Sequence, residues 1–193
     1  MPAHPDLIDR DDLLLVVIDI QAKLAAAMDR HNAVATAVTR LVRTAALVGA
    51  PVVVTRQYPA GLGDTVAEVG QALSEAGEAV PVSVIDKTAF CACDEPSFLP
   101  LLEACGRRQV VIAGMETHIC VVQTALALTA HGFRVQVVDD ACCSRRDRDH
   151  DIALARLRAQ RVTVTSTESV MYEAVGRSGT DEFRRLLAIV KHG

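Results

Sequence analysis

Short apolar runs alternate along the chain with longer stretches in which apolar residues recur every three or four positions. Each apolar run has the length of a strand, and the six runs are Leu13–Ile18, Pro51–Thr55, Val80–Ile85, Gln109–Ala113, Arg134–Val138 and Arg161–Thr165. Runs of this length and hydrophobicity are typical of strands that are buried on both faces of a sheet. The pattern therefore predicts six buried strands.

The stretches between these runs carry helix signals. In the clearest one, apolar residues repeat at helical spacing between Asn32, where we expect the helix to begin, and Gly49, where we expect it to end. A second helix is predicted to begin at Thr65, because Thr65 and Glu68 have the spacing of a capping box. Further helices are predicted at Ser97–Ala104, Ile119–Ala130, Asp147–Ala159, Thr167–Val175 and Thr180–Val190.

The alternation of strands and helices predicts an α/β fold. Parallel strands joined by helices require right-handed crossovers, which favours a three-layer α/β/α sandwich around a central parallel sheet. The order of the strands in that sheet does not follow from periodicity. A chain of 193 residues without internal repeats fits one domain, which we expect to span residues 1–193.

Charge and composition narrow the classes of function. The net charge is −4 and the basic residues are scattered, so nucleic acid is not an expected partner. The apolar runs are far shorter than the roughly 20 residues that cross a bilayer, so no membrane association is expected. The first residues lack the basic start and apolar stretch of a signal peptide, which predicts a cytoplasmic protein whose six cysteines are reduced.

Three reactive residues follow predicted strands. Asp19 ends the first strand, Lys87 follows the third, and Cys120 follows the fourth. Ligands of open parallel sheets bind beyond the carboxyl ends of the strands, so these side chains can converge if the first and fourth strands are neighbours. We expect Thr117 to cap the next helix and to place Cys120 near its positive end, which would favour a thiolate and supply amides for an oxyanion.

Several motifs resemble the isochorismatase-like cysteine hydrolases. They are DIQ around Asp19, DKTAFCA around Lys87 and GMETHICV around Cys120. Other segments resemble the isochorismatase domain-containing group within that superfamily, namely TRQYPAGLGDTVAE, ETHICVVQTALAL, DDACCSR and TSTESVMYE. The resemblance covers nearly the whole chain, and the motifs together are specific for the family.

The resemblance implies a fold and a catalytic site. It implies a Rossmann-like sheet in the order 3-2-1-4-5-6, a cis peptide at Met115–Glu116, and a catalytic triad of Asp19, Lys87 and Cys120. Asp19 would take the thiol proton, Lys87 would hold the thiolate, and the backbone amides of Glu116 and Cys120 would form the oxyanion hole. The implied reaction is hydrolysis of a small amide through a thioester on Cys120.

Departures from two branches of the family restrict the substrate. Nicotinamidases of this superfamily bind a metal through an Asp and histidines after the second strand, where this chain has TRQYPAGLGDT without histidine. We therefore expect no metal and no other cofactor, and nicotinamide is a poor candidate substrate. True isochorismatases cleave a vinyl ether without relying on the cysteine, so Cys120 favours acyl transfer. Family resemblance also implies a homo-oligomer that acts on a small molecule.

Other residues near the strand ends are candidates for the substrate pocket, with a cap, core or solvated role as the alternative. The candidates are Gln21, Arg56, Tyr58, Phe90, Glu116 and His118. Asp86 and Asp139 are expected to cap loops, and Cys105, Cys142 and Cys143 to pack, although the last two could reach the pocket.

Two other functions remain open from the sequence. A zinc site could be built from Cys91, Cys93, His118 and Cys120. The chain could also be a binding or scaffolding protein that retains the hydrolase fold with little turnover.

Overall fold

The computed structural model describes residues 4–192, and its centre is a six-stranded parallel sheet. The strands are β1 (Leu13–Ile18), β2 (Val52–Gln57), β3 (Val82–Lys87), β4 (Gln109–Met115), β5 (Arg134–Cys143) and β6 (Thr163–Thr165). Their order across the sheet is β3-β2-β1-β4-β5-β6, which confirms the predicted fold and strand order. All six predicted strands are present, although the first or last residues of most of them differ from the prediction.

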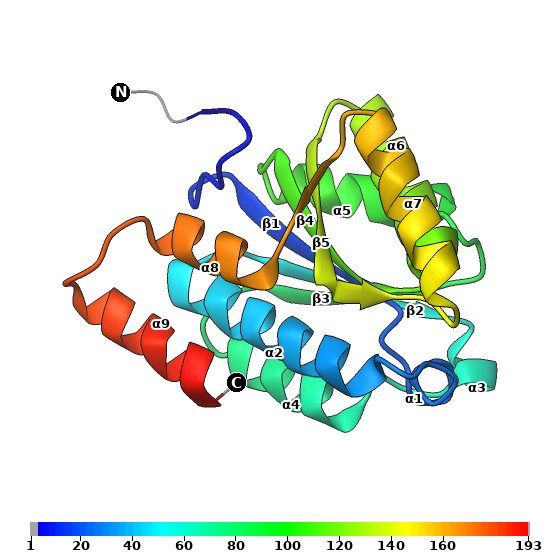
Figure 1. Cartoon of the computed structure of the whole chain (residues 1–193), viewed down its shortest axis with the longest axis horizontal. Helices are drawn as coiled ribbons and strands as arrows, with labels where there is room; N and C mark the ends of the chain where they lie inside the picture. The colour runs from blue at the N-terminus through cyan, green and yellow to red at the C-terminus, as the bar shows by residue number, and fades with distance from the viewer. Residues whose placement is uncertain (1–3, 193) are drawn as a thin grey trace.

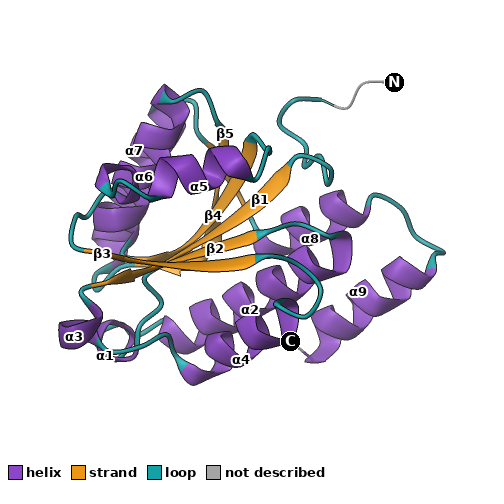
Figure 2. Cartoon of the chain, turned by 180° about the vertical axis from the view of Figure 1, so that it is seen from behind, coloured by secondary structure: helices purple, strands orange, loops and turns teal. Residues whose placement is uncertain are grey.

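Helices cover both faces of the sheet (Figure 1; Figure 2). One face packs against α2 (His31–Val48), α4 (Ala67–Ala76), α8 (Thr167–Val175) and α9 (Asp181–His192). The other face packs against α5 (Phe98–Ala104), α6 (Val122–Ala130) and α7 (Asp147–Ala159). Two single-turn helices, α1 (Ala22–Ala25) and α3 (Pro59–Leu62), lie side by side beyond the carboxyl ends of β1 and β2.

The sequence of β1 explains the two cores. All six of its residues are buried, and successive side chains of a strand point to opposite faces. Leu13, Leu15 and Val17 accordingly join the core under α2, whereas Leu14, Val16 and Ile18 join the core under α5 and α6. A strand that supplies both cores must be apolar at every position, which is the pattern that the sequence shows.

The position of β1 also decides where a ligand site can form. The chain leaves β1 towards α2 on one face and leaves the neighbouring β4 towards α6 on the other. The loops after these two strands therefore diverge, and such a switch point is where open parallel sheets bind ligands.

Two predicted helix starts were wrong. Helix α2 begins at His31 with Arg30 at the N-cap, so Asn32 is already helical, although Gly49 ends the helix in a left-handed conformation (φ 75°) as expected. Helix α4 begins at Ala67, and its N-cap Val66 offers no side-chain hydrogen bond. The capping box fails because the backbone of Thr65 bridges to Gln21 instead.

Strands β2, β3 and β5 extend beyond their predicted ends, because polar residues continue the hydrogen-bonded pairing of the sheet. β2 and β3 pair as far as Gln57 and Lys87, so Lys87 is part of its strand. β5 continues to Cys143, which places Cys142 and Cys143 inside the sheet rather than beyond it. Buried backbone groups need partners whatever the side chain is, so pairing does not stop where hydrophobicity does.

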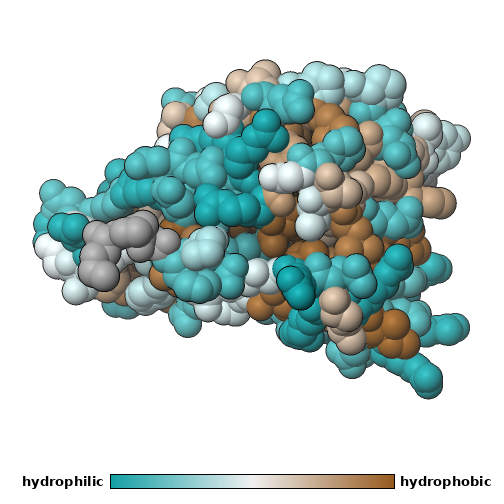
Figure 3. Space-filling model, turned by 90° about the horizontal axis from the view of Figure 1, so that it is seen from above, coloured by the Kyte–Doolittle hydropathy of each residue, from teal (hydrophilic) through white to brown (hydrophobic). Residues whose placement is uncertain are grey.

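Among residues 4–192, no helix is long and apolar enough to cross a membrane. On the face shown in Figure 3, apolar side chains are interspersed with hydrophilic ones.

Candidate active site

The three reactive side chains meet at the carboxyl edge of the sheet. Asp19 follows β1 with a left-handed backbone (φ 52°), Lys87 ends β3, and Cys120 lies in the turn after β4. The Lys87 side chain crosses the end of β2, and its Nζ lies 2.7 Å from Oδ2 of Asp19. Residues from three strand ends that are distant in sequence are thus brought into one cluster.

The Asp19–Lys87 ion pair is fully buried, with 0% of either side chain exposed. Thr55 Oγ1 donates to Asp19 Oδ1 at 2.7 Å, and Lys87 Nζ donates to Gln57 Oε1 at 2.6 Å and to the carbonyl of Ala89 at 3.2 Å. Charges this deep are tolerated only when hydrogen bonds replace their lost hydration. Thr55 and Gln57 supply such bonds, and sequence reasoning missed both because each looks like an ordinary strand residue.

Cys120 is 5% exposed, and its thiol lies beside both Asp19 and Lys87, which act on its pKa in opposite directions. Burial, followed by the negative charge of Asp19, raises the pKa of the Cys120 thiol to about 12, although Lys87 acts in the opposite direction. Burial thus opposes the thiolate that the sequence predicted. The helix dipole favours a thiolate, but desolvation in this buried position outweighs it.

The turn that carries Cys120 differs from the predicted helix start. Residues Thr117–Val121 form a π-helical turn ahead of α6, and Glu116 rather than Thr117 occupies the N-cap position. The Thr117 hydroxyl cannot cap because it is bonded to His150. The preceding peptide, Met115–Glu116, is cis.

Gly114 sets the position of this turn. Its backbone (φ 138°) lies against Ile18 of β1, and a Cβ at this position would overlap the Ile18 carbonyl oxygen. Only glycine permits this approach of β4 to β1 immediately before the turn. A glycine within a strand pattern is the sequence signal for such a contact, and Gly114 in GMETHICV carries that signal.

Two of the six pocket candidates are exposed aromatic residues beside Lys87. Tyr58 is 58% exposed and its amide donates to the Lys87 carbonyl at 2.9 Å, while the ring lies over Gly61. Phe90 is 56% exposed, and its carbonyl accepts from Lys87 Nζ at 3.4 Å. Both rings are exposed, and both residues contact Lys87 through backbone atoms.

Gln21 and Arg56 do not present free polar groups to a ligand. Gln21 is fully buried, and its amide bonds the backbone of Gln57 in both directions and the Gly63 carbonyl. Arg56 pairs with Asp86 at 2.7 Å and with Asp64 at 2.8 Å, and these hydrogen bonds, that of Asp86 first, raise its pKa further. Intramolecular partners thus occupy the polar groups of Gln21 and Arg56, which shape the loops, and their assignment to the pocket stays a prediction. Asp86, expected to cap a loop, is the partner of Arg56.

Glu116 and His118 are bound to the segment between β5 and α7. Glu116 is buried, and its Oε2 accepts from the Arg145 amide at 2.9 Å and from Arg145 Nε at 3.1 Å. His118 Nδ1 lies 2.9 Å from Ser144 Oγ. Both side chains thus hold the turn, which the sequence could not indicate because Arg145 and Ser144 are distant along the chain.

The remaining cysteines separate into two kinds. Cys142 and Cys143 are buried in β5, where burial raises both thiol pKa values, and Cys143 packs against Met28 with 3.3 Å between the sulfurs. The neighbouring Cys93 lowers the pKa of the Cys91 thiol, whereas burial acts in the opposite direction. Within residues 4–192 no three His, Cys, Asp or Glu side chains are grouped to hold a metal, so the zinc alternative lacks the cluster that it requires.

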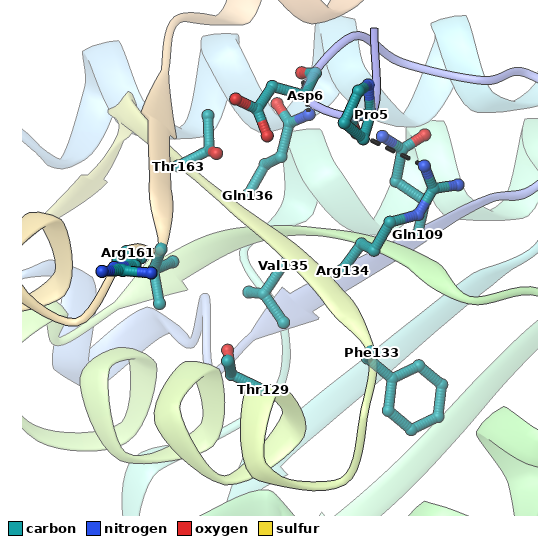
Figure 4. Close-up of a pocket in the computed structure, with 11 residues that line it drawn as sticks. Pro5, Asp6, Gln109, Thr129, Phe133, Arg134, Val135, Gln136, Arg161 and Thr163 are labelled. Atoms are coloured by element: carbon teal, nitrogen blue, oxygen red, sulfur yellow. Dashed lines mark hydrogen bonds between the residues drawn. The ribbon is translucent and has the colours of Figure 1, made fainter. Parts of the chain in front are cut away.

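A cavity of about 260 Å³ lies at the opposite edge of the sheet (Figure 4). Gln109, Arg134 and Thr163, which line it, are the first residues of β4, β5 and β6. The cavity is therefore separated from Cys120 by the length of the strands.

Comparison with known proteins agrees with this architecture. The model of the Isochorismatase domain matches residues 13–169, which is most of the chain. The chain belongs to the isochorismatase family. Isochorismatase domain-containing protein 1 of Salmo salar is 36% identical to it over 173 residues, which are 90% of this chain and 59% of that protein. The chain thus spans little more than half the length of that isochorismatase relative.

Solved structures of isochorismatase-fold proteins superpose over nearly the whole chain. The MAR1 ribonuclease of Caenorhabditis elegans has a TM-score of 0.87 and 28% identity, with 97% of this chain and 93% of that chain covered. The YcaC gene product of Escherichia coli, described as an octameric hydrolase of unknown specificity, has a TM-score of 0.85 and 21% identity, with 98% and 92% covered. The second likeness concerns the fold alone.

Proposed function

We propose that the protein is a cysteine hydrolase that cleaves a small amide or a related carbonyl compound, with Cys120 as the nucleophile. The observation that carries the proposal is the contact of the Cys120 thiol with both members of the buried Asp19–Lys87 pair. A nucleophile beside a base and a fixed positive charge is the arrangement that covalent catalysis requires. The family provides the hydrolase class, and the residue roles are our proposal.

In the first half of the reaction, Asp19 takes the thiol proton as the Cys120 sulfur attacks the carbonyl carbon of the substrate. The raised pKa of the thiol supports this order, because a base must remove the proton during attack. Lys87 balances the negative charge of the cluster, and the amides of Glu116 and Cys120 bind the oxyanion. Asp19 then gives its proton to the leaving amine, and a thioester remains on Cys120.

In the second half, Asp19 removes a proton from a water molecule that attacks the thioester. The carbon–sulfur bond breaks, the carboxylic acid leaves, and the sulfur recovers the proton. The exposed rings of Tyr58 and Phe90 are proposed to contact the substrate at the rim. No step of this scheme requires a cofactor or a metal.

Two measurements on purified protein test the assignment. Alkylation of Cys120 by iodoacetamide needs the thiolate but no proton donor, because iodide leaves without a proton. Lys87→Met should slow it at least about tenfold, since each unit of pKa rise removes about nine-tenths of the thiolate. Asp19→Asn should still be alkylated but should fail to hydrolyse amides, because the leaving amine then lacks its proton donor.

Cys105 provides the internal reference for alkylation. It is half-buried and follows α5, near the amino end of β4 and therefore at the opposite end of the strands from the cluster, so its labelling rate should be the same in every variant. Turnover would be measured as amine release from a panel of small amides, with mass spectrometry of the thioester on Cys120. Equal labelling of Cys120 in Lys87→Met and wild type, or full amide turnover by Asp19→Asn, would refute the proposed roles.

The partners that we propose follow from charge and family. A net charge of −4 disfavours RNA as substrate, although the C. elegans relative is named a ribonuclease. We propose that this protein self-associates, as the YcaC protein does in its octamer, and that it works in the cytoplasm. Light scattering after gel filtration measures the assembly, and a monomer at micromolar concentration would exclude it.

A further inference from the structure

One short segment, from Ser144 to His150, contacts three consecutive residues of the turn that carries Cys120. Ser144 bonds His118, and Arg145 bonds Glu116, as described above. The third contact joins His150 of α7 to Thr117, with 2.9 Å between Nδ1 and Oγ1. Unlike the other two, this contact is buried at both ends, because Thr117 is 0% and His150 is 2% exposed.

His150 also contacts Asp139, so Thr117, His150 and Asp139 form a chain of hydrogen bonds that we call the relay. Nε2 of the same ring lies 3.0 Å from Oδ1 of Asp139. A carboxylate oxygen only accepts, so the hydrogen on Nε2 points to Asp139, and in the neutral ring Nδ1 accepts from the Thr117 hydroxyl. The expectation that Asp139 caps a loop is therefore corrected: Asp139 lies in β5 and orients the His150 ring.

The relay has the residue types of a catalytic triad, but its hydroxyl cannot act as a nucleophile. A nucleophile must meet the substrate, and the Thr117 side chain is completely buried. The relay instead reaches the cluster through the chain, since Thr117 is the first residue of the π-helical turn and Cys120 lies three residues later. Lys87 lowers the pKa of the Cys120 thiol only while the sulfur stays close to it, so the position of this turn controls the reactivity of the thiol.

We propose that His150 is a positioning residue for Cys120, and that it acts by holding the Thr117 hydroxyl while Asp139 fixes the orientation of its ring. The proposal rests on the nucleophilic role proposed above for Cys120. Losing the Thr117–His150 hydrogen bond releases the start of the turn and moves the sulfur away from Lys87. Displacements of about 1 Å in a reacting group cost about 100-fold in rate.

Thr117→Val and Thr117→Ser form a matched pair for the test. Valine keeps the shape of threonine and removes the hydroxyl, whereas serine keeps the hydroxyl and removes a methyl group. We expect Thr117→Val to slow alkylation of Cys120 by iodoacetamide about 10- to 100-fold and to move the pH midpoint of labelling upward. Thr117→Ser should stay close to the wild-type rate and midpoint.

A second pair separates the two sides of the imidazole. In His150→Asn the amide replaces Nδ1 and can still bond Thr117, whereas in His150→Gln the amide reaches the Nε2 position and bonds only Asp139. We expect the glutamine variant to behave as Thr117→Val and the asparagine variant to label faster than the glutamine variant. Should the histidine variants not fold, the threonine pair carries the test alone.

The outcomes distinguish this inference from the proposed function. If Cys120→Ser retains the amide turnover of the wild type, the nucleophile assignment itself fails. If wild-type Cys120 labels rapidly and Thr117→Val has the same rate and pH midpoint, the positioning role is overturned. A fall in thermal stability with an unchanged pH midpoint would show that the relay only stabilises the fold, and would also overturn the proposal.

Discussion

Replacing Gly114 by alanine tests whether the approach of β4 to β1 positions the candidate active site. A Cβ at Gly114 would overlap the Ile18 carbonyl oxygen and lie 2.7 Å from the carbonyl carbon and the amide nitrogen of Ile18. All three atoms belong to the backbone of the central strand, so no side chain can rotate away. The strand or the turn must therefore move.

The expected loss in the free energy of unfolding is the sum of two costs. A non-glycine residue held in a sparsely populated backbone conformation, here φ 138°, costs about 1–3 kcal/mol. Overpacking a core position costs about another 1–3 kcal/mol. The free energy of unfolding should fall by about 2–6 kcal/mol, which is a large part of the roughly 5–15 kcal/mol of a typical domain.

Equilibrium unfolding in urea measures this loss. With a slope of about 2 kcal/mol per molar urea, the midpoint should fall by about 1–3 M. Gly70 offers a matched control, because it lies within α4 and an added Cβ meets no atom within 4 Å. Gly70→Ala should raise stability by about 0.4–1 kcal/mol, since alanine restricts the unfolded chain.

The rate of Cys120 alkylation provides a second measurement on the Gly114→Ala variant. Gly114→Ala should also slow alkylation of Cys120 under conditions where the protein remains folded, because Gly114 lies three residues before the start of the turn. A midpoint of unfolding equal to that of the wild type would contradict the steric argument. A loss of stability with normal labelling of Cys120 would show that the turn is positioned by other contacts.

Three further variants and one treatment have expected outcomes. Lys87→Met leaves the Asp19 charge buried and unpaired, so it should lower the free energy of unfolding by about 3–5 kcal/mol in urea, and adding Asp19→Asn should restore part of the loss. Hydrogen bonds from the backbone amides of Ala89 and Thr88 lower the pKa of Glu95 in the folded state. The ionised Glu95 side chain therefore stabilises the fold above the pKa of the unfolded chain, which is near 4.3. This stabilisation is lost as the pH falls through the lower pKa of the folded state. Acid titrations of wild type and Glu95→Gln should therefore differ in stability at pH 6 and converge in strong acid; parallel curves would contradict this. Phe98→Ala should cost about 3–5 kcal/mol in the same urea assay, because the ring is completely buried under the sheet. EDTA should leave amide turnover unchanged, and a loss that zinc restores would overturn the metal-free assignment.

Local physical rules determined much of this fold from the sequence. The apolar run of β1 predicted a strand buried on both faces because each of its residues enters one of two cores. Gly49 predicted the end of α2 because a left-handed conformation is easiest for glycine. Strand order came from family resemblance, since periodicity does not record which strands are neighbours.

Tertiary structure alone decided the chemistry of the candidate site. The sequence placed Asp19, Lys87 and Cys120 after strands, but only the packed sheet buries them together and raises the pKa of the thiol. The Thr117–His150 contact likewise joins residues 33 positions apart. Burial and hydrogen-bond partners are properties of the packed chain, and local sequence patterns therefore cannot report them.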